Sequence, residues 1–100
     1  MKKDLLKIIK YYGINNQQRK LMEEIFELQE AITKDELGFY NKEHIAEEIA
    51  DCYVILEQFR HYYIISDDEI LENMEFKIDR QIKRMLNEVF EEEYGDDEDE

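Results

Sequence analysis

The stretch NKEHIAEEIADCYVILEQFRHYY, residues 41–63, decides the fold class of this chain. It contains neither glycine nor proline, and its apolar side chains recur at alternating spacings of four and three residues. They are Ile45, Ile49, Cys52, Leu56, Phe59 and Tyr63. This spacing places them on one side of an α-helix, in the pattern of helices that pack in bundles. The stretch therefore predicts a long helix with one apolar face.

The segments before this stretch carry the same helical periodicity. Residues 3–12 predict a short helix that stops at Gly13, which suits a C-terminal cap. A second helix is expected to run from a cap at Asn15 or Asn16 to about Thr33. Its apolar stripe consists of Leu21, Ile25, Leu28 and Ile32.

After the central stretch, Ser66 and Glu69 form a capping box that predicts a fourth helix. Its apolar side chains are Ile70, Leu71, Met74, Ile78, Met85 and Val89. The chain of 100 residues has no proline and only three glycines, so it has few breaks for helices and room for one core. We expect an all-α domain at residues 1–90 and a disordered acidic tail at residues 91–100.

Composition excludes several classes of protein. The net charge is −14, and because residues 91–100 hold eight acids and no base, the remaining chain carries −6. This balance provides no basic surface for polymeric nucleic acid. The single cysteine, Cys52, excludes an intramolecular disulfide, and the apolar runs are too short for a membrane span. We therefore expect a cytoplasmic protein.

Two pairs of acids at i, i+3 lie on the second and third predicted helices. Glu24 and Glu27 form the first pair, and Glu48 and Asp51 form the second. At ~100° per residue, Glu24 and Glu48 lie ~70° and ~65° from the centres of their apolar stripes, in the same rotational sense. Packing the two stripes together would line four carboxylates along one edge, where Mg²⁺ would relieve their repulsion.

A simpler interpretation competes with the metal site. With 27 acids in 100 residues, such pairs arise by chance, and most acid pairs are solvated. On spacing alone, the sequence favours this interpretation. The chain would then be a non-enzymatic acidic helical interaction module, or adaptor.

The fourth predicted helix carries a polar and basic stripe. Asn73, Lys77, Arg80 and Arg84 recur at i, i+4, i+7 and i+11. Lysine and arginine at these positions can hold phosphate oxygens, with arginine suited to bidentate contact. The alternative is that these bases pair with carboxylates of neighbouring helices.

Three runs together resemble a known family. QRKLMEEIFELQEAI at residues 18–32, EEIAD at residues 47–51 and KIDR at residues 77–80 are similar to the MazG-like branch of the all-α nucleotide pyrophosphohydrolase superfamily. The similarity spans about residues 12–85. Its pattern is an ExxE pair followed, after one helix break, by an ExxD pair and then a basic helix.

The resemblance implies a helical bundle completed as a homodimer or homotetramer. The four acids would bind Mg²⁺, or Mn²⁺ as a substitute, and the enzyme would hydrolyse a nucleoside triphosphate to the monophosphate and pyrophosphate as nucleotide-pool housecleaning. Glu47 and Glu23 are the nearest further acids to act as general base. The expected substrate contacts are Lys77, Arg80, Asn73 and Gln18. Periodicity places Gln18 on the buried side of its helix, where it either hydrogen-bonds the base or is a tolerated boundary residue.

Overall fold

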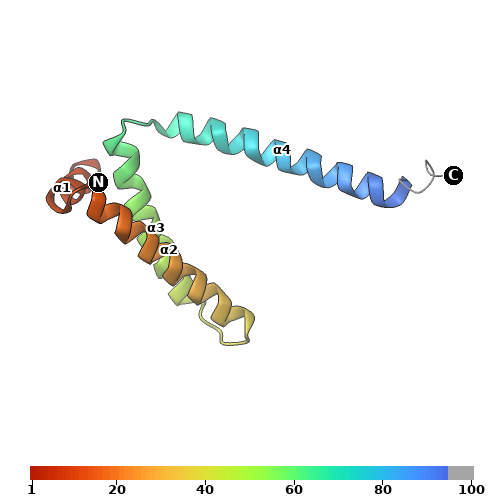
Figure 1. Cartoon of the computed structure of the whole chain (residues 1–100), viewed down its shortest axis with the longest axis horizontal. Helices are drawn as coiled ribbons and strands as arrows, with labels where there is room; N and C mark the ends of the chain where they lie inside the picture. The colour runs from red at the N-terminus through yellow and green to blue at the C-terminus, as the bar shows by residue number, and fades with distance from the viewer. Residues whose placement is uncertain (95–100) are drawn as a thin grey trace. The chain divides into compact units, whose positions relative to one another are not determined.

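The computed structural model describes the backbone of residues 1–94 and the side chains of residues 1–93. This part of the chain has four α-helices and no strand, which confirms the all-α prediction. The helices are α1 (Lys2–Tyr12), α2 (Ile14–Glu36), α3 (Lys42–Tyr62) and α4 (Asp67–Tyr94), as labelled in Figure 1. Internal contacts divide the chain into two compact units, one of Met1–Ile65 and one that begins at Ser66.

A single residue, Gly13, separates α1 from α2. Its φ of +87° is in the region that favours glycine, and its N–H donates to the carbonyl of Ile9 at 2.9 Å, closing α1. The predicted end of the first helix is therefore confirmed. The predicted asparagine cap is wrong, because the turn at Gly13 lets α2 begin at Ile14. Asn16 instead donates its side-chain amide to the carbonyl of Tyr12 at 2.6 Å.

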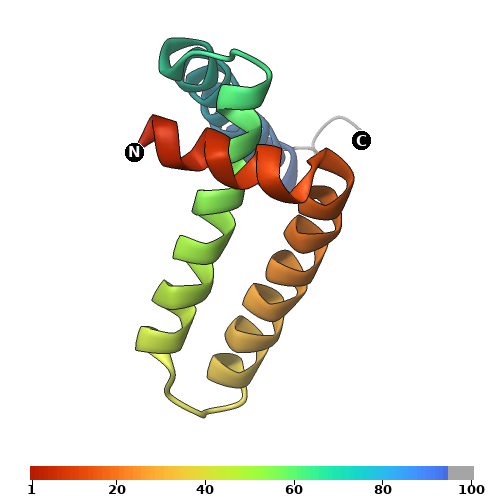
Figure 2. The same ribbon diagram turned by 90° about the vertical axis from the view of Figure 1, so that its left-hand side faces the viewer.

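The first unit is an antiparallel hairpin of α2 and α3 with α1 lying across one end. Figure 2 shows α1 crossing the hairpin at the end opposite the α2–α3 loop. Asn41 closes the loop end, where its side-chain amide donates to the carbonyl of Ala31 at 2.9 Å. The buried apolar side chains come from all three helices and are Leu5, Ile9, Ala31, Cys52 and Ile55.

The line along which α2 and α3 meet, called the seam below, follows the prediction only in part: Cys52 is buried as expected, but other predicted positions are not. The three buried side chains of α2 are spaced seven residues apart in the sequence. Each of the two helices buries one acid, Glu24 in α2 and Glu48 in α3. The buried seam residues are Gln17, Glu24 and Ala31 of α2, and Glu48, Cys52, Ile55 and Gln58 of α3. Several residues that the predicted stripes bury are exposed: Ile25, Ile32, Ile49, Leu56 and Tyr63. Each apolar stripe is wider than the surface that one neighbouring helix covers. The two helices can therefore pack along the edge of the stripe, where the acids lie.

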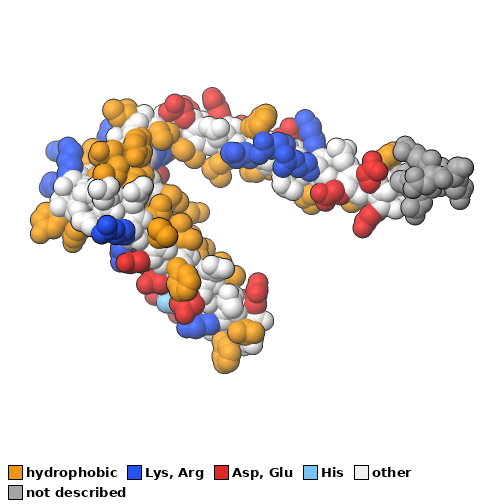
Figure 3. Space-filling view, viewed as in Figure 1, with side chains coloured by type: hydrophobic (Ala, Val, Ile, Leu, Met, Phe, Trp, Pro, Cys, Tyr) orange, Lys and Arg blue, Asp and Glu red, His pale blue; other side chains and the backbone are white. Residues whose placement is uncertain are grey.

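The second unit is the helix α4 with its capping box. The Ser66 N–H donates to Glu69 Oε2 at 2.7 Å, and the Glu69 N–H donates to Ser66 Oγ at 3.1 Å, which confirms the predicted cap. All described side chains from Ser66 onward are exposed, and Figure 3 shows apolar and basic side chains along this helix. The helix continues to Tyr94, beyond the predicted end of the domain at residue 90. The rest of the predicted tail, residues 95–100, lies outside the described residues.

No helix in residues 1–94 has the length and apolar character needed to cross a membrane.

Candidate metal centre

Three carboxylates converge on one side of the α2–α3 hairpin. Glu24 and Glu27 lie one turn apart on α2, and Glu48 lies opposite them on α3. One oxygen of each lies within 4.8 Å of the others. Glu24 is 5% exposed and Glu48 is 7% exposed, whereas Glu27 faces solvent. The predicted meeting of the two acid pairs is thus found for three of the four residues.

The two buried carboxylates lack partners for part of their hydrogen-bonding capacity. Within the described chain, Glu24 Oε2 and Glu48 Oε2 are buried and accept no hydrogen bond. Burial raises the pKa of Glu48, and the negative charges of Glu27 and Asp51 raise it further. The centre therefore holds more negative charge than its surroundings neutralise.

Two basic side chains lie near the buried acids, one beside each. Lys20 Nζ lies 2.9 Å from Glu24 Oε1, and this hydrogen bond, with the negative charge of Glu24, raises the pKa of Lys20. His44 Nε2 lies 3.7 Å from Glu48 Oε1, beyond ordinary hydrogen-bond length. Both the Lys20 and the His44 side chains are about half exposed. Each can move into solvent without opening the core.

Asp51, the fourth predicted ligand, lies at the edge of the centre. Its side chain is exposed, and it is outside the group of three carboxylates within 4.8 Å of one another. Its charge still acts on the centre, because it raises the pKa values of Glu48 and of the buried Cys52. Burial is the main reason for the raised pKa of Cys52, which makes the thiol a poor nucleophile.

These residues fit a hard divalent cation. Carboxylate oxygens are the ligands that Mg²⁺ prefers, and Mg²⁺ commonly binds through one or two carboxylates while keeping several waters. A cation here would have Glu24, Glu27 and Glu48 as its nearest ligands, with Asp51 one turn along α3 from Glu48.

The two candidate general bases lie outside the group of three acids. Glu23 is exposed, with an oxygen 3.9 Å from Lys20 Nζ. Glu47 is also exposed, with an oxygen 3.8 Å from His44 Nδ1. Of the two, Glu23 also lines a hollow beside α1. Glu23 thus borders this hollow, whereas Glu47 does not.

The predicted burial of Gln18 is wrong. Gln18 is exposed, and its neighbour Gln17 is 6% exposed and lies in the seam. Because successive residues differ by ~100° around a helix, the shift of the seam toward the acids turns Gln18 outward. The sequence gives no apolar signal for Gln17, because two of the three buried residues of α2, Gln17 and Glu24, are polar.

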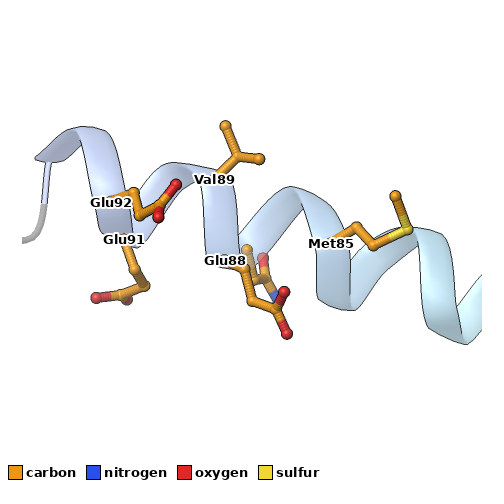
Figure 4. Close-up of a pocket in the computed structure, with 6 residues that line it drawn as sticks. Met85, Glu88, Val89, Glu91 and Glu92 are labelled. Carbon is orange, nitrogen blue, oxygen red and sulfur yellow. The ribbon is translucent and has the colours of Figure 1, made fainter.

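The other predicted substrate contacts lie on α4, in the second unit. The Asn73 side-chain amide donates to the carbonyl of Glu69 at 2.8 Å, and the guanidinium of Arg80 lies 5.6 Å from the ring centre of Phe76. Lys77 is exposed. A surface near the end of α4, lined by Met85, Asn87, Glu88, Val89, Glu91 and Glu92, is formed by one helix alone (Figure 4). It offers no enclosed site.

Comparisons with family models, with curated proteins and with solved structures found no match to this chain.

Proposed function

We propose that this protein is a Mg²⁺-dependent nucleoside triphosphate pyrophosphohydrolase. The observation that carries the proposal is the pair of buried carboxylates, Glu24 and Glu48, each with an oxygen that accepts no hydrogen bond within residues 1–93. Buried ionised groups are ordinarily paired or bound to a metal. Here Lys20 contacts only the other oxygen of Glu24, and the neighbouring acids Glu27 and Asp51 add negative charge.

The reaction is proposed from the ExxE and ExxD pattern together with this arrangement. Glu24, Glu27, Glu48 and Asp51 would hold the cation, which supplies charge neutralisation and polarisation of a phosphoryl oxygen when bound. Lys20 is close enough to the acids to hold phosphate oxygens beside them. Glu23 is exposed and one residue from Glu24, which suits it to accept a proton from an attacking water.

The basic stripe of α4 provides further cations for the substrate. Asn73, Lys77 and Arg80 are the proposed phosphate contacts there, and the exposed position of all three leaves them accessible. Arginine and lysine at one helical face suit a chain of phosphates. These three residues belong to the second unit, so substitutions there test their contribution to substrate binding without changing the acids of the first unit.

We also propose that the protein is a homodimer or homotetramer. The described helices expose many large apolar side chains, among them Ile25 and Phe26 of α2, Leu56 of α3, and Leu71 and Ile78 of α4. Exposed apolar faces of this extent are typical of surfaces that a partner covers. A second copy of the same chain would bury them in a symmetric assembly.

The test is a screen of the canonical ribo- and deoxyribonucleoside triphosphates with Mg²⁺, read by ³¹P NMR. We expect equal amounts of nucleoside monophosphate and pyrophosphate, and strongly reduced turnover in Glu48→Gln. Glu43→Gln, an exposed acid on the same helix, is the matched control and should keep full activity. Release of orthophosphate would contradict the proposed cleavage between α and β phosphates. Absence of turnover by a folded protein on every nucleotide would favour the adaptor interpretation.

A further inference from the structure

The side-chain amides of Gln17 and Gln58 form a buried pair in the seam, nearer than the acids to the end of the hairpin that α1 crosses. Gln17 Nε2 donates to Gln58 Oε1 at 2.7 Å, and the two residues are 6% and 2% exposed. Burying polar side chains costs free energy that a single hydrogen bond only partly offsets. The bond uses one N–H of Gln17 and one lone pair of Gln58. The pair can therefore still offer the Gln17 carbonyl oxygen and the Gln58 amide group to a ligand.

Both carboxamides line a hollow of about 550 Å³ between α1, α2 and α3. Its other lining residues combine apolar, aromatic and charged side chains: Ile8, Tyr12, Asn16, Arg19, Lys20, Glu23 and Val54. Six of the nine lining residues are polar or charged, which suits a polar ligand, and Ile8, Tyr12 and Val54 supply apolar surface. The hollow lies wholly within the first unit.

Lys20 connects the hollow with the candidate metal centre, although the three clustered acids themselves do not line the hollow. Gln17 and Glu24 are seven residues apart on α2, a rise of about 10.5 Å along the helix. Lys20 lies between them, lines the hollow and contacts Glu24 at 2.9 Å. A nucleotide has this same layout, with a hydrogen-bonding base at one end and phosphates at the other.

We propose that this hollow binds the nucleoside part of the substrate, with Gln17 and Gln58 selecting the base. This inference rests on the proposed function. The two carboxamides pair with a base edge that carries a donor beside an acceptor, and Tyr12 offers an aromatic wall for stacking. Lys20 holds the phosphate end. Because a mismatched base leaves buried amides without partners, the pair discriminates strongly between bases.

The experiment measures binding of nucleoside 5′-monophosphates to the full-length, metal-free chain by titration calorimetry, with ribose 5-phosphate as the ligand that lacks a base. The variants are Gln58→Leu and the double variant Gln17→Leu/Gln58→Leu. Replacing both partners by apolar side chains of similar shape is nearly neutral for stability, so the double variant keeps the fold, which circular dichroism checks. Gln29→Leu, on the exposed side of α2, is the matched control.

We expect one monophosphate to bind the wild type about tenfold or more tightly than the others, and than ribose 5-phosphate. Both Gln58 variants should lose this preference, and the Gln29 variant should keep it. Equal binding of all ligands to the wild type, or a preference that survives in the double variant, would overturn the inference.

Pyrophosphate release by the same samples separates this inference from the proposed function. Turnover with no base preference would overturn the role of the carboxamides and leave the hydrolase standing. Base-selective binding without any turnover would support the hollow as a nucleotide site and count against hydrolysis.

Discussion

Glu24 and Glu48 face each other across the α2–α3 seam, both buried and each with one oxygen that accepts no hydrogen bond from residues 1–93. In the metal-free protein, Glu48→Gln removes a buried negative charge beside Glu27 and Asp51. We expect this variant to unfold at a higher temperature than the wild type in the presence of EDTA. Thermal unfolding followed by circular dichroism measures the shift. The exposed Glu43→Gln serves as the control, and a lower midpoint for Glu48→Gln alone would contradict the account.

The same carboxylate predicts how stability depends on pH. The pKa of Glu48 lies above its ordinary value of 4.5 because of burial and of the neighbouring acids. Its protonated form is therefore favoured by folding. This contribution to stability is fully present below the unfolded-state pKa and is lost as pH rises through the folded-state pKa.

We accordingly expect the difference in unfolding midpoint between wild type and Glu48→Gln, in EDTA, to widen as pH rises from 4 toward neutrality. Parallel midpoint curves across this range would contradict the assigned repulsion at Glu48. Glu57 acts in the opposite direction, since its hydrogen bonds from Arg60 lower its pKa, so comparison with the variant is needed to isolate Glu48.

Lys20 should compete with the cation for Glu24. Lys20→Met keeps most of the side-chain volume and removes the charge that lies 2.9 Å from Glu24. In EDTA we expect a loss of about 0.5–1 kcal/mol, a modest value because the ammonium is half exposed. The stabilisation gained on adding Mg²⁺ should be larger than in the wild type. Lys34→Met, an exposed lysine of the same helix, is the control; a smaller Mg²⁺ effect in Lys20→Met would show that the two cations do not compete.

The exposed apolar side chains of α4 predict assembly. Ile78 lies on the same side of this helix as Met74 and Met85, and all three are exposed in the single chain. We expect Ile78→Asp to shift the protein toward the monomer in sedimentation-velocity experiments. Asn87→Asp introduces the same charge on the opposite side of α4 and should leave assembly unchanged. An equal effect of the two substitutions would argue against an apolar interface at Ile78.

The sequence predicted the helices well because their signals are local. The capping box of Ser66 and Glu69 and the glycine stop at Gly13 depend only on neighbouring backbone groups, and both were found. The prediction of an asparagine cap for α2 was wrong at the same junction. Gly13 alone makes the turn between α1 and α2, so α2 begins at Ile14, before either asparagine.

The site was harder to predict because it depends on which side of each helix becomes buried. Apolar stripes on α2 and α3 are broad, so spacing alone could not decide between burial of Ile25 and burial of Glu24. The meeting of Glu24, Glu27 and Glu48 followed from the shared rotational sense of the acid pairs. The burial of Gln17 and Gln58 depends on the contact between α2 and α3, and polar residues at seam positions gave no apolar pattern that would reveal it.

The most direct test of the metal centre is the unfolding temperature with and without Mg²⁺. At a Mg²⁺ concentration about 100-fold above the dissociation constant, binding to the native state adds about 2.7 kcal/mol. The wild-type midpoint should then rise by roughly 10–20 °C. Glu24→Gln and Glu48→Gln should abolish this rise while remaining folded, and Glu43→Gln should keep it. A wild-type midpoint that does not respond to saturating Mg²⁺ or Mn²⁺, or a full response in both seam variants, would contradict the assignment of Glu24 and Glu48 as metal ligands.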